Sequence, residues 1–577
     1  MSRNKKQKLE LTWIGKENRP KLEPRILLED PEKSYHAAHR VSQSDIFDNR
    51  LIHGDNLLAL KALEQDFSGK IKCVYIDPPF NTQQAFEHYD DGVEHSVWLS
   101  LIRDRMEIIN NLLSDDGTLF VHIDDNEIGY LIVILDEIFG RSNRVTLVTF
   151  KQGSATGHKS INPGVVNTSN FILIYSKNKN LWNPNRVFTA RSERDKRYGK
   201  FIENVESDFS DWRFTTLAKA FADSLGMNER GLKKSLGDEY ETKLSDFVIA
   251  NAKSVTQLAR PNYNAVSSAA REVIDKSRAD ASQVMKLPRE GYSDMYFIGG
   301  QRILFYSDKL KLVDGEYVAG EPLTSIWDDV LSNNLHKEGN VEFPKGKKPE
   351  ALIKRCLDLS TKPGDIVLDS FAGSGTTGAV AHKMGRRWIM VELGDHCHTH
   401  IIPRLTRSIN GEDNSGITKI VNWKGGGGFR YYRLAPSLME QDKWGNWVIC
   451  KQYNSAMLAE AVCKLEGFHY APSDSIYWQH GYSTETDFIY VTTQNLTHEQ
   501  LQAISEEVGS SKSLLVCCSA FRSRPDAFPN LTIKKIPNAV LSRCEWGHDD
   551  YSLNVENLPQ KPPEPGQQDL FGEEEGE

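Results

Sequence analysis

The sequence predicts an α/β protein built around a largely parallel sheet. Short β-branched runs such as 71–76 (IKCVYI) alternate with helical periodicity, as in 98–114 (WLSLIRDRMEIINNLLS). Strands separated by helices of this length indicate βαβ units. The chain is also large enough for several packed cores, because its 577 residues are 39% hydrophobic and 10% aromatic.

The expected elements divide the chain into six segments. Residues 1–44 are polar and charged, and we expect a loose arm. Residues 45–177 contain strands and helices in alternation, but too few strands to complete a sheet covered on both faces. The remaining strands are expected in 323–434, where 365–393 (DIVLDSFAGSGTTGAVAHKMGRRWIMVEL) has the pattern of strand, glycine-rich turn, helix and strand. We interpret 178–322 as an inserted domain, 435–559 as a small α/β module, and 560–577 as a disordered acidic tail.

Several classes of protein are disfavoured by the composition. No stretch approaches the roughly 20 apolar residues of a membrane span, so we expect a soluble, cytoplasmic protein without a membrane partner. The eight cysteines form no C-x-x-C pair, and only Cys397, in DHCHTH, has histidines beside it. A metal site there is the alternative, but a second ligand pair is missing and no metal is expected. The net charge of −9 hides a basic excess in 151–290, which is compatible with a local polyanion site.

The first candidate site is the strand end at 75–82 (YIDPPFNT). The two prolines fix φ and make an extended, stiff segment after Asp77. In an open α/β sheet, ligands bind at the carboxyl ends of the strands. We therefore expect Asp77, Pro78, Pro79 and Phe80 to form part of an active site.

The second candidate site is the turn at 371–378 (FAGSGTTG). Glycine lets the backbone approach a ligand closely, although a structural role in a tight turn is the alternative. The next strand ends in Glu392, whose carboxylate is well placed to accept hydrogen bonds from ribose hydroxyls. The turn lacks the lysine of a phosphate-binding loop and the spacing of a dinucleotide site. A nucleoside without a pyrophosphate fits better, and S-adenosyl-L-methionine is such a ligand.

Together, DPPF and DSFAGSG resemble the catalytic and cofactor motifs of the β group of amino DNA methyltransferases. The arrangement over about 50–434, with a central insertion and the ending GGGGFRYYRL, looks most like the modification subunits of type III restriction-modification systems. The resemblance implies a Rossmann-like S-adenosylmethionine-dependent methyltransferase fold with permuted motif order and an inserted target recognition domain. It also implies a set of cofactor-binding residues: Asp55, Asp369, Phe371, Ala372, Gly373, Gly375, Glu392, Phe343, Lys348 and Pro349. Asp124 is a weaker candidate outside this set. Asp55 as a helix N-cap and Lys348 as a surface lysine are the alternatives.

The implied reaction is methyl transfer to the N6 amino group of adenine in double-stranded DNA. The base must leave the duplex, and Phe80 would compensate by stacking, although many relatives have tyrosine there. In this family an acid before Pro-Pro accompanies adenine, so Asp77 favours adenine over cytosine N4. RNA methylation and a catalytically weak DNA-binding specificity subunit remain alternatives.

DNA contacts are expected in the inserted domain, where basic residues alternate with Tyr198 and Phe201. A charge-balanced solvated surface, with Glu193 and Asp195, is the alternative. The basic candidates are Arg191, Arg194, Lys196, Arg197 and Lys200. No helicase or nuclease motif is evident in the sequence, so we expect a homodimer that works with a separate restriction helicase-nuclease subunit.

Overall fold

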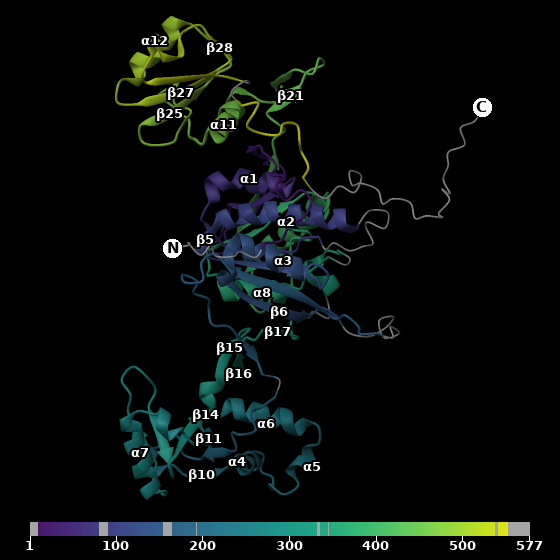
Figure 1. Cartoon of the computed structure of the whole chain (residues 1–577). Coiled ribbons are helices and arrows are strands. Elements are labelled where there is room, and N and C mark those ends of the chain that lie inside the picture. Colours follow the sequence, from purple (N-terminus) through teal and green to yellow (C-terminus); the bar gives the residue numbers. More distant parts are fainter. Residues whose placement is uncertain are drawn as a thin grey trace, which may run out of the picture. The chain divides into compact units, whose positions relative to one another are not determined.

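The computed structural model describes residues 10–79, 91–153, 164–191, 193–331, 335–343, 346–536 and 540–551, with the side chains of 91–94 and 525 also outside the description. It divides into two compact units, residues 1–185 with 325–577, and Arg186–Thr324 (Figure 1). The second unit overlaps the inserted domain expected at 178–322, whose role in target recognition stays a prediction. None of the described helices is long and apolar enough to cross a membrane.

The first unit is organised by a mostly parallel sheet whose strand order interleaves the two halves of the chain. From the central strand outward, β18 (Ile366–Asp369) pairs with β19 (Arg387–Glu392), which pairs with β3 (Asn49–His53). On its other side β18 pairs with β4 (Ile71–Ile76), followed by β5 (Leu113–Ile123). β7 (Ser169–Ser176) is antiparallel to β5 and to β6 (Arg144–Lys151). The sheet predicted from the two sequence segments is therefore one sheet.

Helices cover both faces of this sheet. The face with α1 (Asn56–Phe67), α2 (Asp91–Leu112) and α3 (Ile128–Leu135) holds the largest apolar cluster, in which Trp98 and Val74 are fully buried. α8 (Glu350–Ser360), α9 (Thr376–Lys383) and α10 (Ile402–Ile409) pack in succession against one another, with α8 also on β4 and β5. Helices on both faces explain why consecutive residues in the middle of these strands, such as Leu51 and Ile52 on β3, are apolar and buried.

The N-terminal segment is not a loose arm over residues 10–44, so that expectation is wrong. β1 (Leu27–Glu29) and β2 (Tyr35–His36) pair with β20 (Gly428–Leu434), which itself extends the sheet beside β3. Ile26 is fully buried, and Arg25 is buried against Glu23 at 2.7 Å. The polar composition misled the prediction because the buried charges are paired and β20 supplies hydrogen-bond partners for both strands.

The glycine run 425–428 packs tightly against the sheet. Gly425, Gly426 and Gly427 have φ of +96°, +106° and +76°, which side chains rarely adopt. His382 Nε2–H donates to the Gly426 carbonyl at 2.9 Å, while its Nδ1 lies 3.3 Å from the Asn49 amide nitrogen. Burial lowers the pKa of His382 to about 4. The neutral ring thus ties α9 to the glycine run and to β3.

A buried ion cluster joins α8, α9 and α10. Glu350 accepts from Lys383 Nζ at 2.8 Å and from Arg404 Nη2 at 2.8 Å, and Lys383 also contacts Asp413 at 2.6 Å. All four side chains have 0% exposure. Arg404 Nη1 also donates to the Thr376 hydroxyl at 2.8 Å. The cluster therefore reaches the turn that follows β18.

The inserted unit has its own core and sheets. A six-stranded antiparallel sheet has the order β10-β9-β11-β14-β13-β12, and a second sheet has the order β15-β16-β8. The bounds are β8 (Phe188–Ala190), β9 (Lys200–Ile202), β10 (Phe214–Thr216), β11 (Val255–Ala259), β12 (Met285–Leu287), β13 (Met295–Ile298), β14 (Gln301–Phe305), β15 (Leu310–Val313) and β16 (Glu316–Pro322). The helices are α4 (Leu217–Ser224), α5 (Leu232–Leu236), α6 (Glu239–Ala250) and α7 (Ser268–Ala279).

The segment after β20 contains the expected α/β module. β25 (Asp487–Val491), α12 (His498–Val508) and β27 (Ser513–Cys518) form a βαβ unit with β25 and β27 parallel. β29 (Leu531–Lys535) extends the sheet beyond β27, and α11 (Ser455–Glu466) contributes to its core. The tail predicted at 560–577 lies outside the described residues.

Candidate active site

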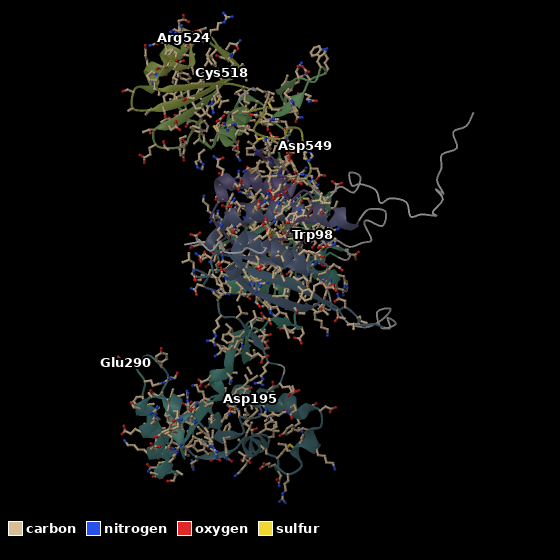
Figure 2. All side chains as sticks on the ribbon, in the orientation of Figure 1. Trp98, Asp195, Glu290, Cys518, Arg524 and Asp549 are labelled. Carbon is tan, nitrogen blue, oxygen red and sulfur yellow. The ribbon has the colours of Figure 1, made fainter. Side chains whose placement is uncertain are left out.

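Asp77 follows β4 directly, at the carboxyl edge of the sheet. Pro78 is buried, and the Pro79 carbonyl accepts a hydrogen bond from Trp98 Nε1 at 2.9 Å. Trp98 is fully buried on α2 and is labelled in Figure 2. The strand end predicted from the sequence is thus anchored by a residue that the sequence analysis did not single out. Phe80 lies outside the described residues, so its predicted stacking role stays a prediction.

Lys348 joins the two candidate sites. Its ammonium lies 2.6 Å from Asp77 Oδ2, and its carbonyl lies 3.4 Å from the Thr376 hydroxyl, just after the glycine turn. Burial raises the pKa of Asp77, and the attraction of Lys348 opposes that shift. Lys348 is therefore not the surface lysine of the alternative interpretation. Its predicted contact with the methionine part of the cofactor remains a prediction.

His122 is the second neighbour of Asp77. It lies near the end of β5, is fully buried, and places Nδ1 3.6 Å from Asp77 Oδ1. Its Nε2 lies 2.9 Å from the side-chain amide nitrogen of Asn170 on β7. Sequence analysis used this segment only for Asp124, which instead accepts hydrogen bonds from the backbone and side chain of Asn126 at 3.1 and 2.8 Å.

The glycine turn has the close backbone geometry expected of it. Gly373 and Gly375 have φ of +53° and +74°, in the region where a Cβ is unfavourable. Asp369 holds the turn by accepting from the Phe371 N–H at 2.9 Å and the Thr377 hydroxyl at 2.5 Å. Burial raises the pKa of Asp369 to about 7. Asp369 thus supports the turn from the end of β18.

Glu392 lies beside this turn at the end of β19. Its Oε2 accepts from the Gly373 N–H at 2.7 Å, and its Oε1 lies 2.9 Å from His396 Nε2. Burial raises the pKa of Glu392, but His396 and the backbone N–H groups outweigh burial and the pKa lies below its usual value. Glu392 is therefore an ionised acceptor at the edge where a ribose is expected.

Phe343 and Pro349 complete the predicted cofactor segment. The Phe343 ring lies 5.3 Å from the His396 ring, and its Cε1 would be 3.9 Å from a Cβ placed on Gly373. Pro349 begins α8 as its N-cap residue, and Ala372 is buried in the turn. The structure thus brings Phe343, the glycine turn and Glu392 together, although they come from separate stretches of sequence.

Asp55 caps α1, as the alternative interpretation anticipates. Oδ1 accepts from the N–H groups of Leu57 and Leu58 at 2.8 and 3.0 Å. Oδ2 accepts from the Tyr551 N–H at 3.0 Å and lies 3.5 Å from Arg105 Nη2. Both oxygens are engaged and the side chain is buried, so the role as acceptor for the adenine of the cofactor stays a prediction.

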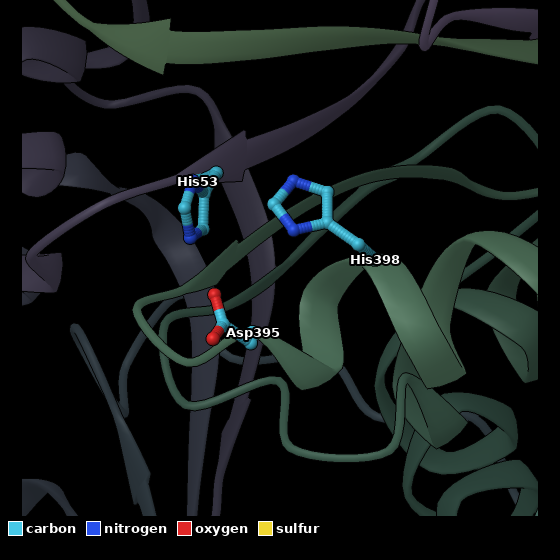
Figure 3. A group of neighbouring side chains, drawn as sticks. All are labelled: His53, Asp395 and His398. Atoms are coloured by element: carbon cyan, nitrogen blue, oxygen red, sulfur yellow. The ribbon is translucent and has the colours of Figure 1, made fainter.

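A possible metal-ligand group lies at the end of β3. His53, Asp395 and His398 each offer a ligand atom within 4.8 Å of the others (Figure 3). Leu393 O lies 3.1 Å from His53 Nε2, and Tyr431 Oη lies 2.8 Å from His398 Nε2, so one nitrogen of each ring is already engaged. Cys397 does not belong to the group and is buried. Sequence analysis missed His53 because only the fold brings it to DHCHTH; the expected absence of a metal stays a prediction.

The predicted DNA-binding residues are partly neutralised. Arg191 and Arg197 contact Asp195, which is labelled in Figure 2, at 3.4 and 2.7 Å. Tyr198 is 2% exposed in the core of the inserted unit, so the expectation that it stacks on bases is wrong. These pairs favour the charge-balanced alternative for part of the cluster. DNA contacts by Arg191, Arg194, Lys196, Arg197 and Lys200 remain predictions.

The chain is similar to several known proteins. The family model described as DNA methylase, N6_N4_Mtase, matches residues 71–402. The probable type III restriction-modification enzyme HindVI Mod subunit of Haemophilus influenzae is 35% identical over 411 residues, which are 67% of this chain and 54% of that protein. The EcoP15I Mod subunit of Escherichia coli is 26% identical over 447 residues, which are 66% of this chain and 63% of that protein. The chain therefore spans between half and two thirds of the length of these relatives.

The chain is also similar to a solved structure, that of a putative DNA modification methylase from Thermus thermophilus complexed with S-adenosyl-L-methionine. The similarity covers 66% of this chain and 99% of that one, with 13% sequence identity and a TM-score of 0.31. The family match spans more than half of the chain and contains the Asp77 strand end, Lys348, the glycine turn and Glu392. On these grounds the chain belongs to the N6 and N4 DNA methylase family.

Proposed function

We propose that this protein transfers a methyl group from S-adenosyl-L-methionine to the N6 amino group of adenine in double-stranded DNA. The observation that carries the proposal is the position of Asp77, at the end of β4 and linked through Lys348 to the glycine turn after β18. An acceptor for an amino group and a nucleoside-binding turn thus lie at the same edge of one sheet, where ligands of such sheets bind.

The residues at this edge fit the cofactor. Gly373 leaves room for a ligand against the backbone, because a Cβ placed there would have no neighbour closer than 3.9 Å, and the ionised Glu392 carboxylate offers acceptors for two ribose hydroxyls. Phe343 would contribute an apolar wall beside the turn. When bound, S-adenosyl-L-methionine supplies an electrophilic methyl group on a sulfonium. No phosphate-binding lysine is needed, because this cofactor has no phosphate.

Asp77 would align the attacking amine. The exocyclic amino group of adenine is a weak nucleophile because its lone pair is delocalised into the ring. Hydrogen bonds from the amino group to Asp77 and to the Pro78 carbonyl would favour a tetrahedral nitrogen and direct the lone pair toward the methyl group. Trp98 and the two prolines hold this acceptor pair rigid, so little rearrangement is needed.

The base must first leave the duplex, at a cost of a few kcal/mol. Stacking on Phe80 would offset roughly 1–3 kcal/mol of that cost. Cytosine N4 is the competing acceptor, since it presents the same type of amino group. Adenine is preferred here because an acid, and not serine, precedes Pro78.

The test is methyl transfer from labelled S-adenosyl-L-methionine to unmodified genomic DNA, followed by digestion to nucleosides. We expect label in N6-methyladenine with the wild type and none with Asp77→Asn. Asp474→Asn, an exposed carboxylate in the C-terminal module, is the matched control and should keep full activity. Label in N4-methylcytosine would refute the base assignment, and undiminished transfer by Asp77→Asn would refute the role of Asp77.

We infer that the protein works as a homodimer with a restriction helicase-nuclease subunit. The support is that the relatives reported above are named as Mod subunits of type III restriction-modification enzymes. The α/β module around β25, α12 and β27 is our candidate for the subunit contact. Light scattering and affinity purification from the native host test this inference. A monomeric mass with no co-purifying helicase would contradict it.

A further inference from the structure

We propose that His122 is a positioning residue that orients the Asp77 carboxylate by donating its Nδ1–H to Asp77 Oδ1. This inference rests on the proposed function, because the orientation matters for the attacking amine. His122 would not touch the substrate. It would act through Asp77, from the strand next to it in the sheet.

Strand register places the two residues side by side. β4 and β5 are parallel, and Ile76 pairs with Val121, so the next residues along the two strands are Asp77 and His122. Nδ1 lies 3.6 Å from Oδ1, slightly longer than a hydrogen bond. A movement of about 0.5 Å would close it, and such contacts commonly tighten when substrate binds.

Asp77 Oδ1 needs a donor. Oδ2 is paired with Lys348 at 2.6 Å, whereas Oδ1 is buried and has no hydrogen-bond partner among the described residues. A buried acceptor without a partner is costly, because its interactions with water are lost. His122 Nδ1 is the polar atom already aimed at it from β5.

Asn170 determines which nitrogen of His122 carries the proton. Its side-chain nitrogen lies 2.9 Å from Nε2, so the amide donates and Nε2 must accept. The single proton of the neutral ring is then on Nδ1. Burial and the positive charge of Lys348 hold the pKa of His122 well below its usual value, in agreement with a neutral ring. The Tyr75 oxygen, 3.3 Å from Nδ1, is the competing acceptor, but a carboxylate is the stronger one.

The expected consequence is a defined carboxylate plane. With only Lys348 as partner, Asp77 could rotate and follow the ammonium away from the base. Donors on both oxygens fix the plane, and the remaining lone pairs then face the position of the amino group. Loss of the His122 donor should therefore lower the rate of methyl transfer while leaving the binding of cofactor and DNA intact.

Two substitutions of similar size separate this role from a purely structural one. The amide nitrogen of His122→Asn can take the place of Nδ1 and face Asp77. The amide of His122→Gln reaches toward Asn170 instead. We expect His122→Gln to lower the single-turnover rate about 10- to 100-fold, and His122→Asn to recover most of it. KM for DNA and the Kd for the cofactor should stay within about twofold in both variants.

A third variant keeps the histidine. Asn170→Leu removes the amide that donates to Nε2, so the ring proton is no longer held on Nδ1 and the rate should also fall. The inference is overturned if His122→Gln or Asn170→Leu transfers methyl groups at the wild-type rate, or if the losses are entirely in KM or Kd. Absence of methyl transfer by the wild type would instead refute the proposed function.

Discussion

The substitution Glu350→Gln tests whether the buried ion cluster holds the cofactor half of the sheet together. Glutamine keeps the size of the side chain but removes the negative charge that faces both Lys383 and Arg404. Lys383 would then keep Asp413 as its partner at 2.6 Å, whereas Arg404 would keep its hydrogen bonds to the Thr376 hydroxyl and the Ser374 carbonyl without a carboxylate partner among the described residues. The amide nitrogen would replace one of the two oxygens and point its N–H donors at groups that are themselves donors: Lys383 Nζ together with either Arg404 Nη2 or the Ile417 N–H.

The magnitude follows from burial. Each side chain of the cluster has 0% exposure, so water cannot compensate for the lost charge. Breaking a buried pair in this way costs about 3–5 kcal/mol. Replacing Lys383 with methionine at the same time restores the charge balance, because one buried cation, Arg404, then remains with one buried anion, Asp413. We expect the double variant to recover about 2 kcal/mol relative to the sum of the single variants.

Hydrogen exchange of β18 and β19 peptides measures the local free energy of opening and does not require two-state unfolding of a multidomain chain. The matched control is Glu239→Gln, which removes an exposed ion pair with Lys243 on α6 and should leave the exchange of β18 unchanged. The reasoning is refuted if Glu350→Gln lowers the free energy of opening by less than about 1 kcal/mol. It is also refuted if the changes caused by Glu350→Gln and Lys383→Met are strictly additive in the double variant.

Three further results are expected. The pKa of His382 falls from 6.5 to about 4 on folding, so as the pH drops the unfolded chain binds a proton before the folded chain does. The contribution of His382 to the free energy of unfolding is therefore complete above pH 6.5 and is lost as the pH falls toward 4. In denaturant titrations, the wild type should lose about 3 kcal/mol more than His382→Gln over this range. Gly375→Ala should weaken cofactor binding in calorimetry, because Gly375 has a φ of +74° and the new Cβ would lie only 3.0 Å from Ile401 Cγ2. Gly69→Ala, where the new Cβ would meet open space, should leave cofactor binding unchanged. Lys348→Met should lower the rate of methyl transfer more than it changes the Kd for DNA; equal losses in both would contradict its pairing with Asp77.

The sequence was sufficient to predict strands that end in Asp77, Asp369 and Glu392, because parallel strands buried on both faces are apolar and end abruptly at turn residues. The partners of those carboxylates were not predictable, since they depend on which strands are neighbours. Lys348 reaches Asp77 because α8, which begins just after it, packs on β4, and His122 does so because β5 pairs with β4 in that register.

The role of Asp55 and the order of the segment 10–44 could not be predicted for two different physical reasons. Asp55 follows a strand and precedes a helix, and an aspartate there serves equally as a ligand acceptor or as an N-cap, so the residue type alone does not decide between them. The segment 10–44 has the composition of a disordered arm. Two of its strands are nevertheless ordered by pairing with β20, which comes much later in the sequence, after the other strands of the same sheet.

The interleaved strand order has a consequence for biosynthesis. β3 and β4 emerge from the ribosome early, but β19 and β18, which separate them in the sheet, are made almost 300 residues later. At typical elongation rates of about 5–20 residues per second, the apolar edge of β4 waits roughly 15–60 s for its neighbour. During that interval the inserted unit Arg186–Thr324, which has its own core, can fold, while the edge of β4 that later pairs with β18 is an unpaired strand edge, open to aggregation.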